Sequence, residues 1–343
     1  MASFLRPTTA EAISAMTPVR AGERKLGETV RTMPVGTGLA EGLRALPEAG
    51  FVVVLVPEDI GVRGNGGRPG AAHLAQAALR RLLAMQDNAF VRGASIVVAG
   101  EVAVQDLMQQ AIGLDASRPA DLARLHALTA EVDARVSAVV AEIAREGRRV
   151  ILFGGGHENA FGLLAGLHNA LGAPLACVNL DAHADLRADA GRHSGNPFSK
   201  AIEAGHLDAY AMIGLHESYL NEHMATRIAS EARLHATTLD AVLRGERTVR
   251  EACEKALAFV DHRPCTLEVD LDVVAGMSAS AASPSGLSAD EARRCVCTLA
   301  AGMDARALHI CEGIPGEGDA SGAGKLAALI ACDFIKAVQG RRA

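Results

Sequence analysis

Asn179–Asp185, with the sequence NLDAHAD, follows an apolar run at residues 175–178 that favours a β-strand. Side chains of an extended strand repeat every second residue, so Asp181, His183 and Asp185 are expected to point from one face. Carboxylates and an imidazole on one face can bind a cation. A polar strand end with solvated carboxylates explains the same residues equally well, so ligands elsewhere in the chain must decide between the two interpretations.

Short apolar runs alternate with helical patterns from Phe51 onward, and no Asn-Gly hairpin lies between two strands. This alternation is typical of a parallel sheet with helices on both faces. We therefore predict a three-layer α-β-α fold with a mostly parallel eight-stranded sheet. Strands are expected at residues 51–56, 94–102, 149–153, 175–180, 209–217, 233–239, 264–274 and 307–315, and the clearest helices at 71–86, 120–146 and 323–340.

The chain has 343 residues, of which 49% are apolar and 22% are charged. A parallel α/β sheet of this length commonly forms one domain. The first fifty residues are weakly patterned, with Pro, Gly and Thr among short amphipathic pieces. We expect residues 51–343 to form a single α/β domain, with residues 1–50 as an arm packed on it.

Composition argues against several classes of partner. The net charge of -6 and the lack of a basic run disfavour nucleic acid, and 3% aromatic residues provide few stacking platforms or membrane anchors. Apolar runs such as residues 51–56 are far too short to cross a bilayer. Seven cysteines without a C-x-x-C motif are typical of free thiols in a reducing compartment. We expect a cytoplasmic protein that binds a small molecule.

Two further strand ends carry residues that commonly bind metals. His157 follows the strand at 149–153 and three glycines, and Asp270 and Asp272 lie at the end of the strand at 264–274. A lone histidine here would more often be a cap or a packing residue. Ligands of parallel sheets bind beyond the carboxyl ends of the strands, however, and three strand ends agree. The predicted metal ligands are His157, Asp181, His183, Asp185, Asp270 and Asp272.

Four carboxylates and two imidazoles exceed what one divalent ion needs. They suit two ions bridged by carboxylates, and an oxygen-rich set without cysteine favours Mn²⁺. Such a pair lowers the pKa of a bridging water and holds hydroxide at neutral pH. The chemistry expected of the site is hydrolysis.

The loop at residues 57–71, PEDIGVRGNGGRPGA, follows the first strand of the predicted domain. It lacks the spacing of a phosphate-binding loop. Arg63 and Arg68 are its candidate anion-binding residues, although a solvated turn explains either arginine equally well.

Five motifs in this order resemble the ureohydrolase superfamily of arginases and agmatinases over about residues 50–340. They are GGGHE (154–158), NLDAHAD (179–185), HSGNPFS (193–199), LEVDLD (267–272) and CEGIP (311–315). The resemblance implies a dinuclear manganese cluster held by the six ligands named above, with two Mn²⁺ per subunit, and a homo-oligomer. It also implies that Glu312 holds the cationic amidine or guanidine group of the substrate.

Within that superfamily the chain is most similar to formimidoylglutamases, through Gly156, the PEDIGVR segment and SGNPF. This implies hydrolysis of N-formimidoyl-L-glutamate to L-glutamate and formamide by a metal-bridging hydroxide, with Asp185 and His193 as catalytic groups beside Glu312. The substrate's carboxylates would be bound by cationic and polar side chains, with Arg187 as first choice, although an ion pair that holds a metal-site carboxylate explains Arg187 nearly as well. The other candidates are Arg63, Arg68, Arg192 and Asn196.

The chain departs from the superfamily pattern at three places. Ser194 precedes Gly195 where arginases carry a proton-shuttling histidine, and His193 lies one residue earlier. The usual Asp-Pro after the D-x-D motif is absent, and Glu268 stands where a small hydroxyl residue is common. A ureohydrolase for a guanidino compound and a non-catalytic family member are therefore kept as alternatives.

Overall fold

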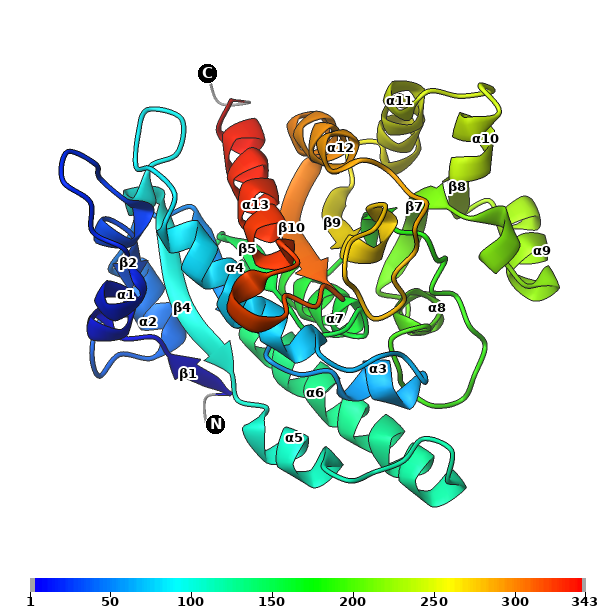
Figure 1. The fold of residues 1–343 in the computed structure, drawn as a ribbon, viewed down its shortest axis with the longest axis horizontal. Coiled ribbons are helices and arrows are strands. Elements are labelled where there is room, and N and C mark those ends of the chain that lie inside the picture. Colours follow the sequence, from blue (N-terminus) through cyan, green and yellow to red (C-terminus); the bar gives the residue numbers. More distant parts are fainter. Residues whose placement is uncertain (1–3, 341–343) are drawn as a thin grey trace.

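The computed structural model describes residues 4–340 and contains one sheet with helices on both faces (Figure 1). Across the sheet the strands are β1 (Leu5–Pro7), β4 (Ile96–Val102), β3 (Phe51–Leu55), β5 (Arg149–Phe153), β10 (Asp304–Cys311), β9 (Pro264–Asp270), β6 (Leu175–Leu180), β7 (Leu207–Leu215) and β8 (Leu234–Thr238). A further strand, β2 (Arg31–Thr32), pairs with β4.

The three-layer class is confirmed, but the sheet has ten strands, not eight. The eight strands from β4 to β8 are parallel and correspond to the eight predicted ones. The two extra strands come from the first fifty residues. Both pair with β4, β1 antiparallel and β2 parallel. They are three and two residues long, so they depend on the free edge of β4 and leave no periodic pattern in the sequence.

Strand β3 is an unbroken apolar run because both faces of the sheet are covered. In β3, Phe51, Val53 and Leu55 belong to one buried cluster, whereas Val52 and Val54 belong to another. The first cluster packs under α4 (Leu74–Leu83), α11 (Val249–Val260), α12 (Ala289–Gly302) and α13 (Ala323–Gly340). The second packs under α6 (Pro119–Arg145), α7 (Asn159–Leu171) and α8 (Pro197–Glu203).

Shorter helices complete the layers and the connections. They are α1 (Ala10–Met16), α2 (Leu39–Arg44), α3 (Ile60–Gly64), α5 (Gln105–Ala111), α9 (Glu222–Ser230) and α10 (Leu239–Leu243). Across residues 4–340, no helix is both long enough and apolar enough to pass through a membrane.

The strands predicted at 264–274 and 307–315 run too far, and the residues after the strand predicted at 175–180 are not extended as expected. β6 ends at Leu180, β9 at Asp270 and β10 at Cys311, so most of the predicted site residues lie in the loops that follow. Glu312 adopts a φ of 63°, which an extended strand does not allow. The strands β5, β10, β9 and β6 are neighbours in the sheet. Their carboxyl ends therefore bring these loops together.

Candidate metal centre and substrate cleft

The NLDAHAD motif reaches its shape through a turn. The expectation that its three polar residues point from one strand face is wrong, because β6 ends before Asp181 and Asp185 takes a left-handed φ of 48°. Asp181 Oδ1 accepts a hydrogen bond of 2.6 Å from the backbone N–H of His183. This local bond folds the segment so that the carboxylates of Asp181 and Asp185 lie close to the same side chains.

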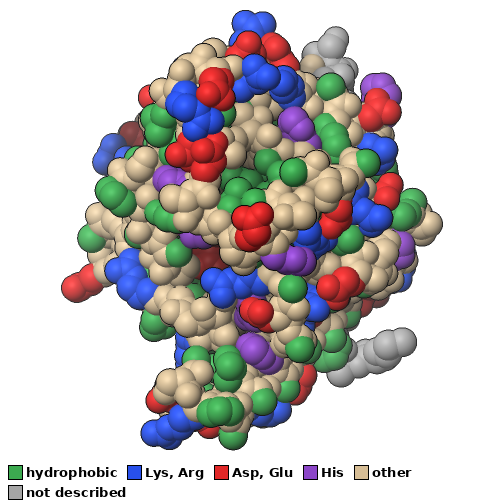
Figure 2. All heavy atoms as spheres, turned by 90° about the vertical axis from the view of Figure 1, so that its right-hand side faces the viewer, with side chains coloured by type: hydrophobic (Ala, Val, Ile, Leu, Met, Phe, Trp, Pro, Cys, Tyr) green, Lys and Arg blue, Asp and Glu red, His purple; other side chains and the backbone are tan. Residues whose placement is uncertain are grey.

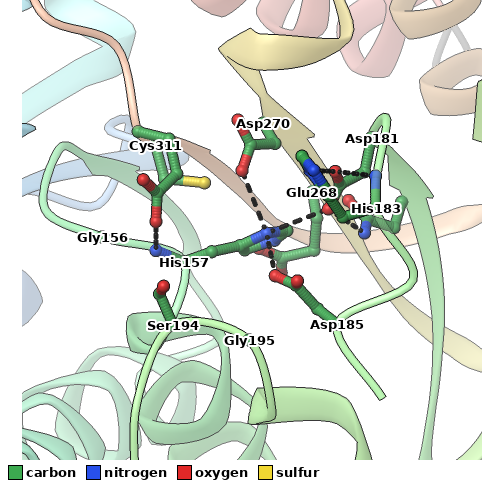
Figure 3. A network of polar contacts seen from close by, with 12 residues as sticks. Gly156, His157, Asp181, His183, Asp185, Ser194, Gly195, Glu268, Asp270 and Cys311 are labelled. Atoms are coloured by element: carbon green, nitrogen blue, oxygen red, sulfur yellow. Dashed lines mark hydrogen bonds and ion pairs between the residues drawn. The ribbon is translucent and has the colours of Figure 1, made fainter. Parts of the chain in front are cut away.

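His157 stands at the centre of the first ligand group and is fully buried. Gly154 and Gly155 before it have φ values of 87° and 75°, a left-handed turn that glycine adopts without cost. His157 Nδ1 lies 3.0 Å from Asp185 Oδ2 and 3.2 Å from Asp181 Oδ2 (Figure 3). It also lies 3.4 Å from Asp270 Oδ2. Two carboxylates from the loop after β6 and one from the end of β9 thus face one ring nitrogen.

His183 forms the second group with the D-x-D motif. Its Nδ1 lies 2.9 Å from Asp272 Oδ2 and 3.6 Å from Asp181 Oδ1. The two aspartates of the D-x-D motif hold each other, because the backbone N–H of Asp272 donates to Asp270 Oδ1 at 2.8 Å. Asp272 Oδ1 also accepts from the backbone N–H of Ala182 at 3.4 Å.

Asp181 belongs to both ligand groups, His157–Asp181–Asp185 and Asp181–His183–Asp272. In each group the ligand atoms lie within 4.8 Å of one another. Both ring nitrogens of His157 are buried without a hydrogen-bond partner in the described part of the chain, which is rare for buried polar atoms. Two neighbouring cations that share one carboxylate would satisfy this donor set.

The titration behaviour of the ligands indicates a shortage of positive charge. Burial alone lowers the pKa of His183, but the carboxylates of Asp181 and Asp272 outweigh it and raise this pKa to about 12. Burial and the charge of Asp181 raise the pKa of Asp272 to about 6. Burial also raises the pKa of Asp270 well above its usual value. A bound cation would relieve the repulsion that these shifts reflect.

Neighbouring polar side chains fix the position of the shared ligand. Asn179 donates through Nδ2 to Asp181 Oδ2 at 3.0 Å and to the Tyr210 hydroxyl at 2.8 Å. The Tyr210 hydroxyl donates in turn to the carbonyl of Ala184 at 3.1 Å. All these groups come from β6, β7 and the loop after β6, so the central strands hold the motif in place.

A cleft of about 530 Å³ opens over these residues, and Figure 2 shows acidic, basic and histidine side chains around a hollow on this face. Its lining residues are Asn65, Gly66, Gly67, Arg68, His183, Ala184, Asp185, Arg187, Ser194, Tyr219, Met224, Asp270, Asp272, Ser280, Ala281 and Glu312. The cleft thus combines metal-ligand carboxylates with two arginines and Glu312.

Glu312 faces the cleft from the end of β10. The backbone N–H of His157 donates to its Oε1 at 2.7 Å, and the Ser280 hydroxyl donates to Oε2. Burial raises the pKa of Glu312 to about 7. The strained φ of this residue and its two hydrogen bonds fix the carboxylate beside the ligand groups, where it can accept hydrogen bonds from a cationic group.

The predicted carboxylate-binding arginines divide into two kinds. Arg187 and Arg68 line the cleft, and Arg68 also donates to Ser278 Oγ and to the carbonyl of Ala279, both at 3.0 Å. Arg63 does not line it. Its guanidinium donates to the carbonyls of Ala111 at 2.6 Å and Leu114 at 3.2 Å. Arg63 therefore holds the end of α5, which argues against its expected role in binding the substrate.

Arg192 and Asn196 also serve the fold instead of the cleft. Arg192 Nε lies 2.8 Å from Oδ2 of the buried Asp133 on α6, and its guanidinium also donates to Asn196 Oδ1. Asn196 Nδ2 donates to the carbonyl of Gly191 at 2.6 Å. These bonds pin the 191–196 loop onto α6, so neither side chain is free to bind the substrate as expected.

His193 is buried away from the cleft, whereas its neighbour Ser194 lines it. His193 Nε2 lies 3.3 Å from Asp189 Oδ2, and its ring packs at 5.4 Å between centroids from that of His126. Burial, together with the charge of His126, lowers the pKa of His193 to about 4. The position of the ring therefore disfavours the expected proton-shuttle role, because consecutive residues point in different directions.

Sequence reasoning missed several lining residues, of which Tyr219 is the largest. Its ring stacks on His183, with centroids 5.1 Å apart and an interplanar angle of 12°, and on His216 at 4.6 Å and 10°. Tyr219 lies four residues after the end of β7 at Leu215, and a search of every strand end for aromatic residues would have found it. Asn65 and Ser280 carried no such signal.

Gly156 and the PEDIGVR segment belong to one assembly. A Cβ atom at Gly156 would lie 2.0 Å from Glu158 Oε2, so Glu158 fills the space that a side chain at position 156 would need. Glu158 Oε1 accepts from the backbone N–H of Gly61 at 2.7 Å. Burial and the charge of Glu58 raise the pKa of Glu158 well above its usual value. This buried carboxylate joins the turn before His157 to the loop after β3.

Comparison with known proteins gives matches over most of the chain. A family model described as Arginase family matches residues 49–337. A formimidoylglutamase of Aeromonas hydrophila is 31% identical over 70% of this chain and 71% of that protein. One from Geobacillus thermodenitrificans is 28% identical over 84% and 83%. A match to the Corynebacterium efficiens formimidoylglutamase is 35% identical but spans about half of each protein, 48% of this chain and 52% of the other.

Solved structures share the fold at lower identity. Trypanosoma cruzi formiminoglutamase with Mn²⁺ has a TM-score of 0.71 at 20% identity, over 93% of this chain and 99% of that one. Formimidoylglutamase from Bacillus subtilis has a TM-score of 0.70 at 15% identity, over 94% of each chain. At these identities the likeness establishes the shared fold.

Proposed function

We propose that this chain, which belongs to the arginase family, is a hydrolase that cleaves a C–N bond of N-formimidoyl-L-glutamate to give L-glutamate and formamide. The observation that carries the proposal is one cleft that joins two ligand groups sharing Asp181 to Glu312 and two arginines. The named relatives support the choice of substrate within the family.

The proposed cofactor is a pair of Mn²⁺ ions, because carboxylate oxygens dominate the donor set and Mn²⁺ accepts them readily. The proposed ligands are His157, Asp181, His183, Asp185, Asp270 and Asp272. When bound, two such ions lower the pKa of a water molecule and stabilise developing negative charge. The T. cruzi relative was solved with Mn²⁺, which supports the choice.

Glu312 holds the amidinium end of the substrate in this proposal. The Ser280 hydroxyl and the His157 backbone N–H fix both of its oxygens, so the carboxylate keeps one orientation. A charge-assisted hydrogen bond from the amidinium then sets the reacting carbon above the ligand carboxylates. Asp185 lines the cleft and is the group we propose for moving a proton from the attacking water to the departing nitrogen.

Arg187 binds a carboxylate at the glutamate end of the substrate. Its backbone N–H donates to the carbonyl of Gly195 at 3.0 Å, and Ser199 Oγ donates to its carbonyl at 2.7 Å. A Cβ at Gly195 would lie 3.0 Å from Arg187 Cδ, so glycine leaves room for the arginine side chain. Arg68 lines the same cleft and is the candidate for the second carboxylate.

A panel of substrates assayed with added Mn²⁺ tests the function. We expect formamide from N-formimidoyl-L-glutamate, and little or no urea from arginine, agmatine or a guanidino acid. If a guanidino compound is turned over faster, the proposed substrate is wrong, but the protein is still a hydrolase. A protein that binds Mn²⁺ fully and turns over none of these compounds would overturn the proposal in favour of a non-catalytic role.

A further inference from the structure

A second buried polar group lies beside His157 and does not line the cleft. Glu268 on β9 and His309 on β10 are register partners in the parallel pair, and both side chains have no exposed surface. His309 Nδ1 lies 2.7 Å from Glu268 Oε2. A carboxylate oxygen accepts hydrogen bonds and an imidazole N–H donates them, so this contact pairs the two side chains.

This pair reaches His157 in two ways. Glu268 Oε2 lies 3.8 Å from His157 Nε2, within ion-pair range and longer than a hydrogen bond (Figure 3). His309 Nε2 lies 3.4 Å from the carbonyl of Gly154, in the turn that leads to His157. The pair therefore contacts both the ring and the backbone turn that presents it.

The orientation of the His157 ring determines what its contact with Glu268 can do. Nδ1 faces the carboxylates of Asp181, Asp185 and Asp270, so it is the atom that would bind a cation. A neutral imidazole that binds a metal through one nitrogen carries its proton on the other, and a carboxylate facing that proton fixes the tautomer and the ring. Glu268 lies where such a carboxylate is needed.

The energetic cost of Glu268 also calls for a role. A buried carboxylate in a central strand destabilises the fold unless it is paired. Oε1 of Glu268 has no hydrogen-bond partner among residues 4–340. Its recorded ion-pair contacts are with two histidines, His309 and His157.

We propose that Glu268 and His309 form a positioning pair that orients His157 for metal binding. The pair is separate from the six proposed ligands, and the inference rests on the proposed metal function. Its expected effect is on metal affinity and ligand geometry, because neither side chain reaches the substrate cleft.

The test uses Mn²⁺ titration calorimetry on the full chain, with the absorption spectrum after Co²⁺ substitution as the second measurement. Glu268→Gln keeps the shape and removes the charge, so we expect metal affinity to fall by about 10- to 100-fold and the Co²⁺ spectrum to change. Asp333→Asn is the matched control. Asp333 is a buried carboxylate on α13 paired with Arg293 and Lys336, and this variant should bind Mn²⁺ as the unaltered protein does.

Two substitutions at His309 keep the inference testable if Glu268→Gln does not fold. His309→Asn retains an N–H donor for Glu268, so this variant should keep most of the Mn²⁺ affinity of the unaltered protein. His309→Leu has no such donor and should lose that affinity. The unfolding midpoint of each metal-free variant separates lost folding from lost metal binding. Unchanged affinity and spectrum in Glu268→Gln, or equal affinities for the Asn and Leu variants at His309, would overturn the pair's role. An unaltered protein that binds no divalent cation would instead contradict the proposed function.

Discussion

The cleft has a metal-ligand floor and an arginine wall, and the two regions are held in different ways. The floor is the set of six proposed ligands, and the wall is Arg68 and Arg187. Three aspartates of the floor, Asp181, Asp270 and Asp272, accept hydrogen bonds from backbone N–H groups. The wall consists of long arginine side chains, and each of them can donate to whichever acceptor lies within its reach. In the proposed function the floor would therefore determine the type of reaction, and the wall would determine which substrate binds.

Arg63 and Arg187 show that an arginine near the cleft can either line it or stabilise the fold. Both follow a strand end, Arg63 on α3 after β3 and Arg187 in the loop after β6. Arg63 donates to the carbonyls of Ala111 and Leu114 at and just after the end of α5, while Arg187 lines the cleft. A guanidinium serves either purpose equally well, so the neighbouring backbone decides its role.

Replacing the shared ligand should have the largest effect. In Asp181→Ala both ligand groups lose a member, so we expect Mn²⁺ binding to be lost. In the proposed function the metal pair would supply several kcal/mol of transition-state stabilisation, so kcat/KM should fall by roughly 10³-fold or more. Calorimetry and the formamide assay measure the two losses. Asp189→Ala is the control, because this carboxylate is 60% exposed and belongs to neither ligand group. Full activity in Asp181→Ala would remove the metal floor from the mechanism.

The floor was largely predictable from the sequence because its chemistry is local. The D-x-H-x-D and D-x-D motifs lie next to strand ends, and parallel strands bring such ends to one edge. The prediction erred on conformation, since the motif is a turn with Asp185 at positive φ. Hydrogen bonds such as Asp181 to the His183 N–H fix that turn, and a period-two pattern cannot reveal them.

Gly156 lies between the floor and Glu158, and adding a side chain at this position should have the second largest effect. Gly156→Asp places a Cβ against Glu158 and a second carboxylate beside a buried one. Overpacking alone costs about 1–3 kcal/mol of the free energy of unfolding, and an unpaired buried charge adds to this cost. Denaturant unfolding measures the loss.

The control and the rescue for this substitution are both available. Gly38→Ala should change stability little, because no atom lies within 4 Å of its added Cβ. Gly156→Asp combined with Glu158→Ala should recover much of the loss, since it removes the clashing carboxylate. If the double variant is as unstable as the sum of the single variants, Glu158 is not what requires glycine at position 156.

Substitutions in the wall should change substrate binding without changing metal binding. Arg187→Ala removes a charge-assisted contact worth about 1.5–3 kcal/mol, so we expect kcat/KM for the dicarboxylate to fall by about 10- to 100-fold, mainly through KM. Arg63→Ala should leave KM unchanged and lower stability, because Arg63 bonds to Ala111 and Leu114. Equal increases in KM for both variants would show that the two arginines are not distinguished as the structure indicates.

Substrate-binding residues other than Arg68 and Arg187 were poorly predicted, for a physical reason. Arg63, Arg192 and Asn196 were all expected to bind substrate, and each is used inside the fold. Their partners are carbonyls and a buried aspartate from distant segments, such as Asp133 on α6. No local spacing carries that information. Tyr219 and Ser280 were missed because each reaches the cleft from a loop with no motif of its own.

The smallest expected effect is a pH dependence of opposite sign with and without metal. In the metal-free protein the pKa of His183 is raised to about 12 and those of Glu58 and Glu312 to about 7. Groups with raised pKa values bind more protons in the folded state than in the unfolded state. The free energy of unfolding therefore falls as pH rises. For His183 this loss begins near 6.5, the ordinary pKa of histidine, so the metal-free midpoint should fall between pH 6.5 and 9.

Added Mn²⁺ should reverse that slope, because the metal competes with the protons held by the floor and binds more tightly as pH rises. Thermal unfolding with a chelator and with excess Mn²⁺ measures both slopes, and each kcal/mol shifts the midpoint by roughly 2 °C in a chain of this size. Arg187→Ala should keep both slopes, since the wall holds no metal, whereas Asp181→Ala should lose the metal-dependent one. A metal-free midpoint that rises over this range would mean that the floor does not hold its protons as the raised pKa values require. A reversed slope that persists in Asp181→Ala would place the metal elsewhere in the molecule.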